Sequence, residues 1–155
     1  MQNPFRRPPQ PLDAPDDQQR WELRQWNDGE LINTTRVRTG IRVPDPAHPI
    51  KIRVSIGYSS LRIDGRPGAT RLDELEEVEN TLIRELGAVD TYLVMVLTGY
   101  SAREFIAYGS QSQFLEKWGP TVLERWTGGP VGATGIDAQT DPKWTFYRRF
   151  SKRAS

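Results

Sequence analysis

The chain contains no cysteine and a single histidine among its 155 residues. The absence of cysteine excludes disulfides, thiolate metal sites and cysteine nucleophiles. His48 lies in the segment Asp45-Pro46-Ala47-His48-Pro49, which is expected at the surface, so we interpret it as an ordinary surface histidine. Histidine-based acid–base catalysis and a transition-metal site are therefore disfavoured, and we expect no metal and no cofactor.

Long hydrophobic runs are also missing. No stretch approaches the ~20 consecutive apolar residues of a membrane-spanning helix, and the segment after Met1 shows no signal peptide. We therefore expect a cytoplasmic protein without membrane contacts. Charge of neither sign dominates, because 21 Lys and Arg balance 20 Asp and Glu to a net charge of +1. The global charge thus gives no argument for nucleic-acid binding.

Large aromatic residues are plentiful, with five each of Trp, Tyr and Phe. Together with a length that suits one domain, they predict a single aromatic-rich core. Residues 1–20 contain five prolines among polar neighbours, a composition that predicts a flexible N-terminal arm. We therefore predict one domain over residues 21–150, followed by a basic C-terminal tail over residues 151–155.

Alternating and turn-forming residues predict several strands. Asn27-Asp28-Gly29 separates two strand-like runs, Trp21–Trp26 and Glu30–Arg38, and so predicts a β-hairpin. Apolar and polar residues alternate from Ile50 to Ile56, as in a strand with one buried face. The run Tyr92–Leu97 is apolar on both faces and is typical of a central strand.

Helical patterns complete the predicted order. Residues 70–87 carry an apolar stripe, with Thr70 and Asp73 arranged like a capping box. A return strand at residues 102–108, a helix from Ser110 onward and a weak strand at residues 133–139 follow. The order strand, helix, strand, strand, helix, strand predicts an α+β fold: a ferredoxin-like βαββαβ sandwich with an added N-terminal β-hairpin.

The most specific segment is Asp141-Pro142-Lys143-Trp144, which precedes Tyr147 and Phe150. Asp141 suits an N-cap and Pro142 the first helical position. The aromatics at positions 144, 147 and 150 recur on one side of the predicted helix. This pattern predicts a short C-terminal docking helix that packs against the sandwich.

Three motifs together resemble a known family. They are Val78-Glu79-Asn80-Thr81-Leu82, the stretch from Leu97-Thr98-Gly99 to Arg103–Tyr108, and Asp141-Pro142-Lys143-Trp144 with Tyr147. Over roughly residues 50–150 the chain resembles the bacterial domain-of-unknown-function family 695. Members commonly have Gly-Met before the Arg-Glu-Phe triplet, where this chain has Ser101-Ala102. The resemblance implies a ferredoxin-like fold akin to the ribonuclease E inhibitor B family, whose members regulate an enzyme by binding it; it implies no catalytic residues.

The leading functional hypothesis is a non-catalytic module that binds another protein, including the roles of regulator, inhibitor or immunity partner. Acidic residues line the predicted first helix between its apolar positions, as on a solvated helix face or an acidic docking surface. Arg103 and Glu104 are neighbours on one strand, so they face opposite sides of the sheet, and one is expected in a hydrogen-bond network; alternatively, Arg103 binds an anion. The candidate partner-binding residues are Asp73, Glu74, Glu77, Arg103, Arg148, Arg149, Lys152 and Arg153.

Two alternatives stay open. Arg148, Arg149, Lys152 and Arg153 lie beside aromatic residues, a combination that suits RNA binding. A carboxylate-based enzyme would instead require Glu79 and Glu104 to converge in a pocket. The oligomeric state and the identity of any partner cannot be predicted from the sequence.

Overall fold

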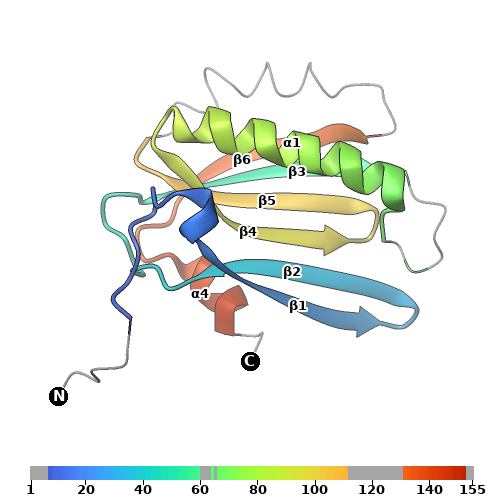
Figure 1. The fold of residues 1–155 in the computed structure, drawn as a ribbon, viewed down its shortest axis with the longest axis horizontal. Helices are drawn as coiled ribbons and strands as arrows, with labels where there is room; N and C mark the ends of the chain where they lie inside the picture. The colour runs from blue at the N-terminus through green and yellow to red at the C-terminus, as the bar shows by residue number, and fades with distance from the viewer. Residues whose placement is uncertain (1–6, 60–63, 65, 112–130, 153–155) are drawn as a thin grey trace.

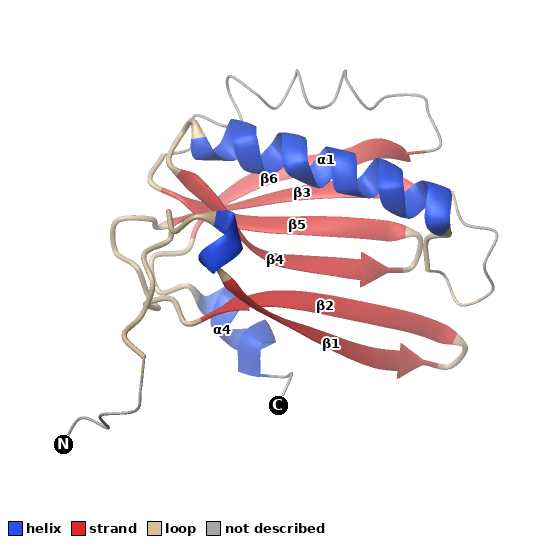
Figure 2. Cartoon of the chain, in the orientation of Figure 1, coloured by secondary structure: helices blue, strands red, loops and turns tan. Residues whose placement is uncertain are grey.

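The computed structural model describes residues 7–59, 64, 66–111 and 131–152. Within them, six strands form one antiparallel sheet in the order β1-β2-β4-β5-β3-β6 (Figure 1). The strands are β1 (Arg20–Asp28), β2 (Leu31–Thr39), β3 (Ile50–Tyr58), β4 (Thr91–Gly99), β5 (Ala102–Gly109) and β6 (Val131–Thr140). Helix α1 (Ala69–Gly87) crosses one face of the sheet and α4 (Thr145–Lys152) lies on the other (Figure 2).

The alternation of side chains along the strands creates two hydrophobic clusters. On the α1 face, Ile52, Val54 and Ile56 of β3 pack with Leu75 and Leu82 of the helix. The α4 face holds a second cluster of residues from β2, β4, β5 and the C-terminal segment: Val37, Met95, Ile106, Tyr108, Trp144 and Tyr147. Strand β4 contributes to both clusters, which confirms the prediction of a central strand covered on both faces.

The coarse sequence prediction of a mixed α and β fold with an N-terminal hairpin is confirmed. The hairpin closes on Asp28 and Leu31, so its two loop residues are Gly29 and Glu30. Helix α1 begins one residue earlier than predicted, after Gly68, and no side chain caps it, so the predicted capping box is wrong. The helix predicted after Ser110 lies outside the described residues. No described helix has the length and apolar character needed to cross a membrane.

Asp141 and Trp144 hold α4 against the sheet. The carboxylate of Asp141 accepts hydrogen bonds from the backbone N–H groups of Thr145 and Phe146, which confirms its predicted capping role. Pro142, however, precedes the helix, because Trp144 adopts a left-handed φ of 53° and the helix begins only at Thr145. Residues 141–144 thus form a turn that aims the Trp144 ring inward.

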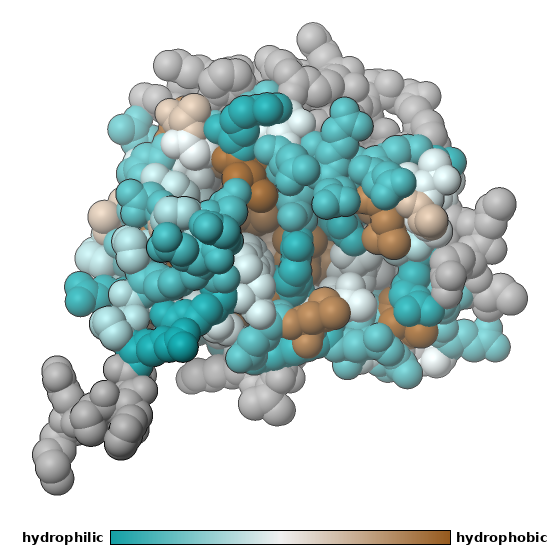
Figure 3. Space-filling view, in the orientation of Figure 1, coloured by the Kyte–Doolittle hydropathy of each residue, from teal (hydrophilic) through white to brown (hydrophobic). Residues whose placement is uncertain are grey.

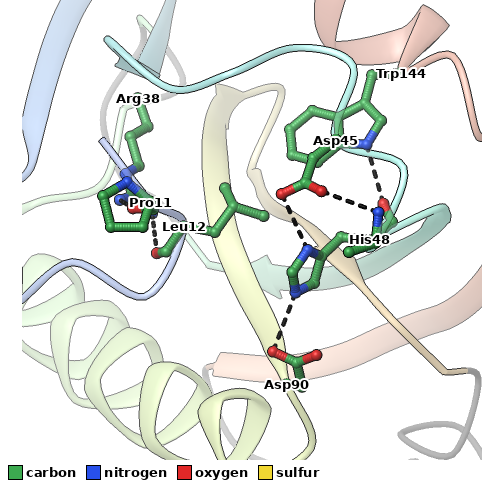
Figure 4. A network of polar contacts seen from close by, with 8 residues as sticks. Pro11, Leu12, Arg38, Asp45, His48, Asp90 and Trp144 are labelled. Carbon is green, nitrogen blue, oxygen red and sulfur yellow. Dashed lines mark hydrogen bonds and ion pairs between the residues drawn. The ribbon is translucent and has the colours of Figure 1, made fainter. Parts of the chain in front are cut away.

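The Trp144 ring is fully buried and stacks on Tyr108, with ring centroids 4.0 Å apart and planes 14° apart. Its indole N–H donates to the backbone carbonyl of His48 at 2.9 Å. Figure 4 shows this bond beside the imidazole of His48, which lies between the carboxylates of Asp45 and Asp90 at 3.1 and 3.0 Å. His48 therefore ties the loop before β3 to the start of β4, rather than lying at the open surface as predicted.

The structure corrects the prediction of a flexible arm for residues 7–20. Leu12 is 5% exposed and belongs to the α4-side cluster, and Gln10 forms a parallel bridge with Ile41. The guanidinium of the buried Arg38 donates to the carbonyls of Leu12 and Pro11 at 2.6 and 2.9 Å (Figure 4). Composition missed this packing because a buried Leu12 and hydrogen bonds from Arg38 and to Gly40, all formed with distant parts of the chain, hold the segment, and composition does not record such contacts.

We predict that Trp144→Ala lowers the free energy of unfolding by roughly 3 to 5 kcal/mol, because the variant removes a fully buried ring and its hydrogen bond. Urea denaturation measures the change. Trp26→Ala is the matched control, since the Trp26 ring is 51% exposed, and its loss should be under about 1 kcal/mol. Equal losses in the two variants would contradict the anchoring role of Trp144.

Asp141 should make stability depend on pH. Burial opposes its ionisation, but hydrogen bonds from Tyr108, Thr145 and Phe146 hold the pKa of Asp141 below its ordinary value of 3.8. Its contribution is therefore fully present above pH 3.8 and is lost as pH falls through the lower folded-state pKa. We predict that Asp141→Asn lowers the free energy of unfolding by about 1 kcal/mol at pH 7 and much less near pH 2. A difference between the proteins that stays constant from pH 7 to pH 2 in urea denaturation would contradict this.

Candidate functional site

A groove of about 390 Å³ lies on the α4 side, lined by residues of α4 and of the sheet. We call it the α4 groove. Its apolar walls come from β1, β4, the β4–β5 turn and α4, and its polar floor comes from β2, β3 and β5. The lining residues used below are Trp26, Leu97, Tyr100, Phe146, Phe150, Arg53 and Glu104.

Helix geometry places two rings of the groove side by side. Phe146 and Phe150 are one turn apart on α4, and their ring centroids are 4.6 Å apart. Tyr147, by contrast, turns into the core, where its hydroxyl donates to the carbonyl of Arg38 at 2.5 Å. Trp26 of β1 and Tyr100 of the β4–β5 turn, which also line the groove, are 51% and 54% exposed. The groove therefore presents large aromatic surfaces to solvent.

The floor of the groove is a neutralised ion pair. The guanidinium of Arg53 on β3 donates to the carboxylate of Glu104 on β5, and the Ser55 hydroxyl donates to the same oxygen at 3.4 Å. Nearby, the ammonium of Lys51 lies 4.3 Å from the centroid of the Phe146 ring, a cation–π contact. The charged groups of Arg53 and Glu104 are thus already engaged, whereas the buried side-chain nitrogen of Asn33, which also lines the groove, has no hydrogen-bond partner among the described residues.

A second cluster lies on the α1 face. Glu79 of α1 forms an ion pair with Arg36 of β2, and Arg103 of β5 donates from Nε to the Thr98 hydroxyl at 2.9 Å. Burial lowers the pKa of Arg103, while the charge of Glu79 opposes that shift. Thr98 and Arg103, together with Thr34 and Arg66, also line a smaller hollow of about 260 Å³ near the start of α1. Arg103 therefore takes part in a hydrogen-bond network, as predicted for one residue of the Arg103–Glu104 pair.

The structure does not bring the candidate partner-binding residues together. Asp73 and Glu77 are exposed on α1, where Glu74 pairs with Arg71 at 2.7 Å. Arg148 and Arg149 are exposed on α4, which ends at Lys152, on the opposite face of the sheet. Arg153 lies outside the described residues. The acidic and basic candidates thus form two separate surfaces.

The two carboxylates that an enzyme hypothesis requires in one pocket also lie apart. Glu79 is over the α1 face of the sheet and Glu104 is on the α4 face, and each is paired with a different arginine. Within the described part of the chain, no group of three or more His, Asp or Glu side chains could hold a metal ion. The geometry gives no support to carboxylate chemistry shared by these two residues.

Sequence reasoning missed the α4 groove, although one signal for it was present. The four-residue spacing of Phe146 and Phe150 places their side chains next to each other on a helix surface. The prediction of a docking helix treats its aromatics as core residues and so overlooks this pair. Trp26, Leu97 and Tyr100 come from distant strands, so only the sheet order reveals that they join Phe146 and Phe150.

Comparison with known protein families identifies a match over most of the chain. A family model described as "Family of unknown function (DUF695)" matches residues 19–151. No curated protein and no solved structure matches the chain.

We predict that Glu79→Gln lowers the free energy of unfolding by roughly 1 to 3 kcal/mol, because Arg36 and the half-buried Arg103 would lose their neighbouring negative charge. Urea denaturation measures the change. Glu76→Gln, at an exposed position on the same helix, should change stability by less than about 0.5 kcal/mol. Equal behaviour of the two variants would show that the pair with Arg36 contributes nothing.

Proposed function

This chain belongs to DUF695, a family of unknown function, and we propose that it is a non-catalytic module that binds a segment of a partner protein in the α4 groove. The observation that carries this proposal is the cluster of exposed aromatic side chains around one hollow. Trp26 and Tyr100 leave half of their surface in water and line the same groove as the paired rings of Phe146 and Phe150. Such rings are the residues that most often anchor protein interfaces.

The groove favours a partner segment with one large apolar or aromatic side chain. Its volume of about 390 Å³ is at the small end of the range for binding pockets, so it suits an anchor residue rather than an extended ligand. Burial of such a side chain would remove apolar surface of Trp26, Leu97 and Phe150 from water, at about 25 cal/mol for each Å². The closed ion pair of Arg53 and Glu104 adds polar contacts without an unpaired charge.

The charged residues around the groove indicate which residues of the partner segment would flank its anchor residue. Arg149 follows Phe146 by three residues on α4, which places the two side chains on adjacent parts of the helix surface. Arg148 and Arg149 are both exposed. Acidic residues beside the anchor would therefore gain favourable electrostatic contacts and faster association.

A regulatory role for this binding is also part of the proposal. The order β6-β3-β5-β4, with α1 between β3 and β4, supports a ferredoxin-like arrangement, for which the second helix is predicted by the sequence alone. The resemblance to ribonuclease E inhibitors rests on this fold likeness, which is an analogy rather than a property of the groove. The cytoplasmic location and the bacterial origin stay predictions.

RNA binding is less well supported by the geometry. Trp144 and Tyr147, two of the aromatics beside the basic residues, are 0% and 6% exposed and cannot stack on bases. The exposed cations Arg148 and Arg149 are left to contact phosphates. A titration with single-stranded RNA at low salt distinguishes the alternatives: salt-sensitive binding that disappears in the Arg148→Ala, Arg149→Ala double variant would favour RNA over the proposed function.

Selection of peptides from a random library displayed on phage tests the proposal on the full chain. We predict that the selected peptides share an aromatic or large aliphatic residue flanked by Asp or Glu. Their affinity, measured by isothermal titration calorimetry, should fall roughly ten-fold or more in Trp26→Ala and in Phe150→Ala, since each variant removes an aromatic wall of the groove.

Leu72→Ala is the matched control, because Leu72 is an exposed apolar residue on α1, over the other face of the sheet, and does not line the groove. Its affinity for the peptides should equal that of the unchanged chain. Circular dichroism of each variant checks that the fold is retained. Peptides that bind Trp26→Ala and Phe150→Ala at full strength, or a selection that yields no binding peptide, would overturn the proposal.

A further inference from the structure

Strand β1 is an edge of the sheet, with β2 on one side only. Asp28 lies opposite Leu31, and a two-residue hairpin loop closes on a hydrogen-bonded pair. Hydrogen bonds to β2 therefore come from the even-numbered residues of β1. The N–H and C=O groups of Trp21, Leu23 and Gln25 point away from β2, and within the described ranges no hydrogen bond to them is found on that side.

The opposite edge of β2 supports this parity. The N–H of Ile32, an even-numbered residue, donates to the carbonyl of Asp64 at 3.0 Å rather than to β1. In the same way Arg36, another even-numbered residue, lies opposite Val96 of β4. Successive residues of β2 thus direct their backbone hydrogen bonds alternately to β1 and away from it, as an antiparallel ladder requires. The same register means that the odd-numbered residues of β1 direct theirs to the open edge.

One exposed apolar side chain lies near the middle of this edge, between the charged Glu22 and Arg24. Leu23 is 72% exposed, the largest exposed fraction among the described large hydrophobic residues. Figure 3 shows small, separate hydrophobic areas among hydrophilic ones in the lower part of the molecule, the region of the β1–β2 hairpin. Natural proteins usually protect an edge strand with charges, a proline or a bulge, because free backbone groups recruit other strands. An exposed leucine at the centre of an open edge is instead typical of a strand that has a partner.

We propose that this partner is a second copy of the chain, whose β1 pairs antiparallel with β1 about a two-fold axis at Leu23. In this register Leu23 faces Leu23 of the partner subunit, and Trp21 faces Gln25, so the outward backbone groups of both strands meet in hydrogen-bonded pairs. The same register sets Glu22 opposite Arg24 in the two closer, non-hydrogen-bonded pairs. At the centre, Leu23 thus meets its own copy and Glu22 meets Arg24, two residues that also pair within one chain, while Trp21 meets the neutral Gln25, so no like charges face each other there.

The charges that would face each other, and the length of strand that would be paired, favour this register over those with the two-fold axis at another residue of β1. A two-fold axis at Arg24 would set Arg24 against its own copy, and an axis at Glu22 would do the same for Glu22. An axis at Gln25 would set Glu22 opposite Asp28. Like charges directly opposite each other destabilise a strand pair. An axis nearer the start of β1 would avoid such a conflict but would leave most of the strand unpaired, so the axis at Leu23 is favoured.

The paired strands would join two six-stranded sheets into one continuous sheet. Cross-strand neighbours point to the same face, so both α4 helices and both α4 grooves would lie on one face of the dimer. A partner protein with two anchor segments could then bind both grooves at once, with a gain in overall affinity. The dimer itself depends only on β1 and not on the proposed function of the groove.

Charge reversal tests the pairing. Sedimentation velocity of the full chain should show a monomer–dimer equilibrium over the micromolar range. Arg24→Glu and Glu22→Arg should each weaken dimerisation roughly ten-fold or more, because each sets like charges opposite one another. An equimolar mixture of the two variants should dimerise again, since the two acidic side chains of one chain then face the two basic side chains of the other. The double variant E22R/R24E should also recover.

Arg84→Glu and Glu76→Arg are the matched controls, with the same charge changes at exposed positions of α1. They should dimerise like the unchanged chain. An unchanged chain that stays monomeric throughout the range would overturn the proposal. A dimer that Arg24→Glu and Glu22→Arg leave intact, or a mixture that stays monomeric, would overturn the register.

A cross-link gives an independent readout, because the chain has no cysteine of its own. Facing residues of a hydrogen-bonded pair have Cα atoms about 5.5 Å apart, within the range that a disulfide spans. Leu23→Cys should therefore form a disulfide-linked dimer on mild oxidation. Gln25→Cys, on the same face of the strand, would place its two thiol-bearing residues roughly 14 Å apart and should stay uncross-linked. Equal cross-linking of the two variants would contradict the axis at Leu23.

Discussion

The stacking of Trp144 on Tyr108 is the contact on which the second face of the sheet depends. Helix α4 has only eight residues, too few to be stable alone, so its position comes from tertiary contacts. The buried Trp144 ring, its bond to the His48 carbonyl and the Asp141 cap supply those contacts. Once Trp144 is fixed, Tyr147 enters the core and Phe146 and Phe150 are left beside the open sheet. The groove is therefore a consequence of the anchor.

A buried arginine, Arg38, holds the N-terminal segment against the same face of the sheet. Arg38 is fully buried, and burial lowers its pKa against the opposing influence of Tyr147, Asp16 and Asp13. An isolated buried cation is costly, so its guanidinium needs acceptors, and the carbonyls of Pro11 and Leu12 provide them. The Tyr147 hydroxyl bonds to the backbone of the same arginine. The two ends of the chain are thus held on the sheet through one residue of β2.

Local sequence patterns predicted the elements well where backbone chemistry decides them. The alternation from Ile50, the doubly apolar run of β4 and the cap by Asp141 all depend on residues close in the chain. The ordering of Leu12 and the α4 groove depend on contacts between segments far apart, such as Arg38 with Leu12 or Trp26 with Phe150. No periodicity records such pairings. The left-handed backbone conformation of Trp144 could not be predicted for the same reason. Burial of the ring imposes this conformation, and no glycine or asparagine at the position indicates it.

Strand β1 links the two surfaces that matter for binding. Its even-numbered side chains lie on the α4 face, where Trp26 lines the groove, while its odd-numbered residues turn their backbone groups to the open edge. A partner bound in the groove would contact the same strand that a second copy would extend. Because extension of a sheet restrains its edge strand, dimerisation would hold Trp26 more rigidly and reduce the ordering cost of binding there. Because β1 carries both the open edge and Trp26, dimerisation at the edge would affect binding of a partner in the groove.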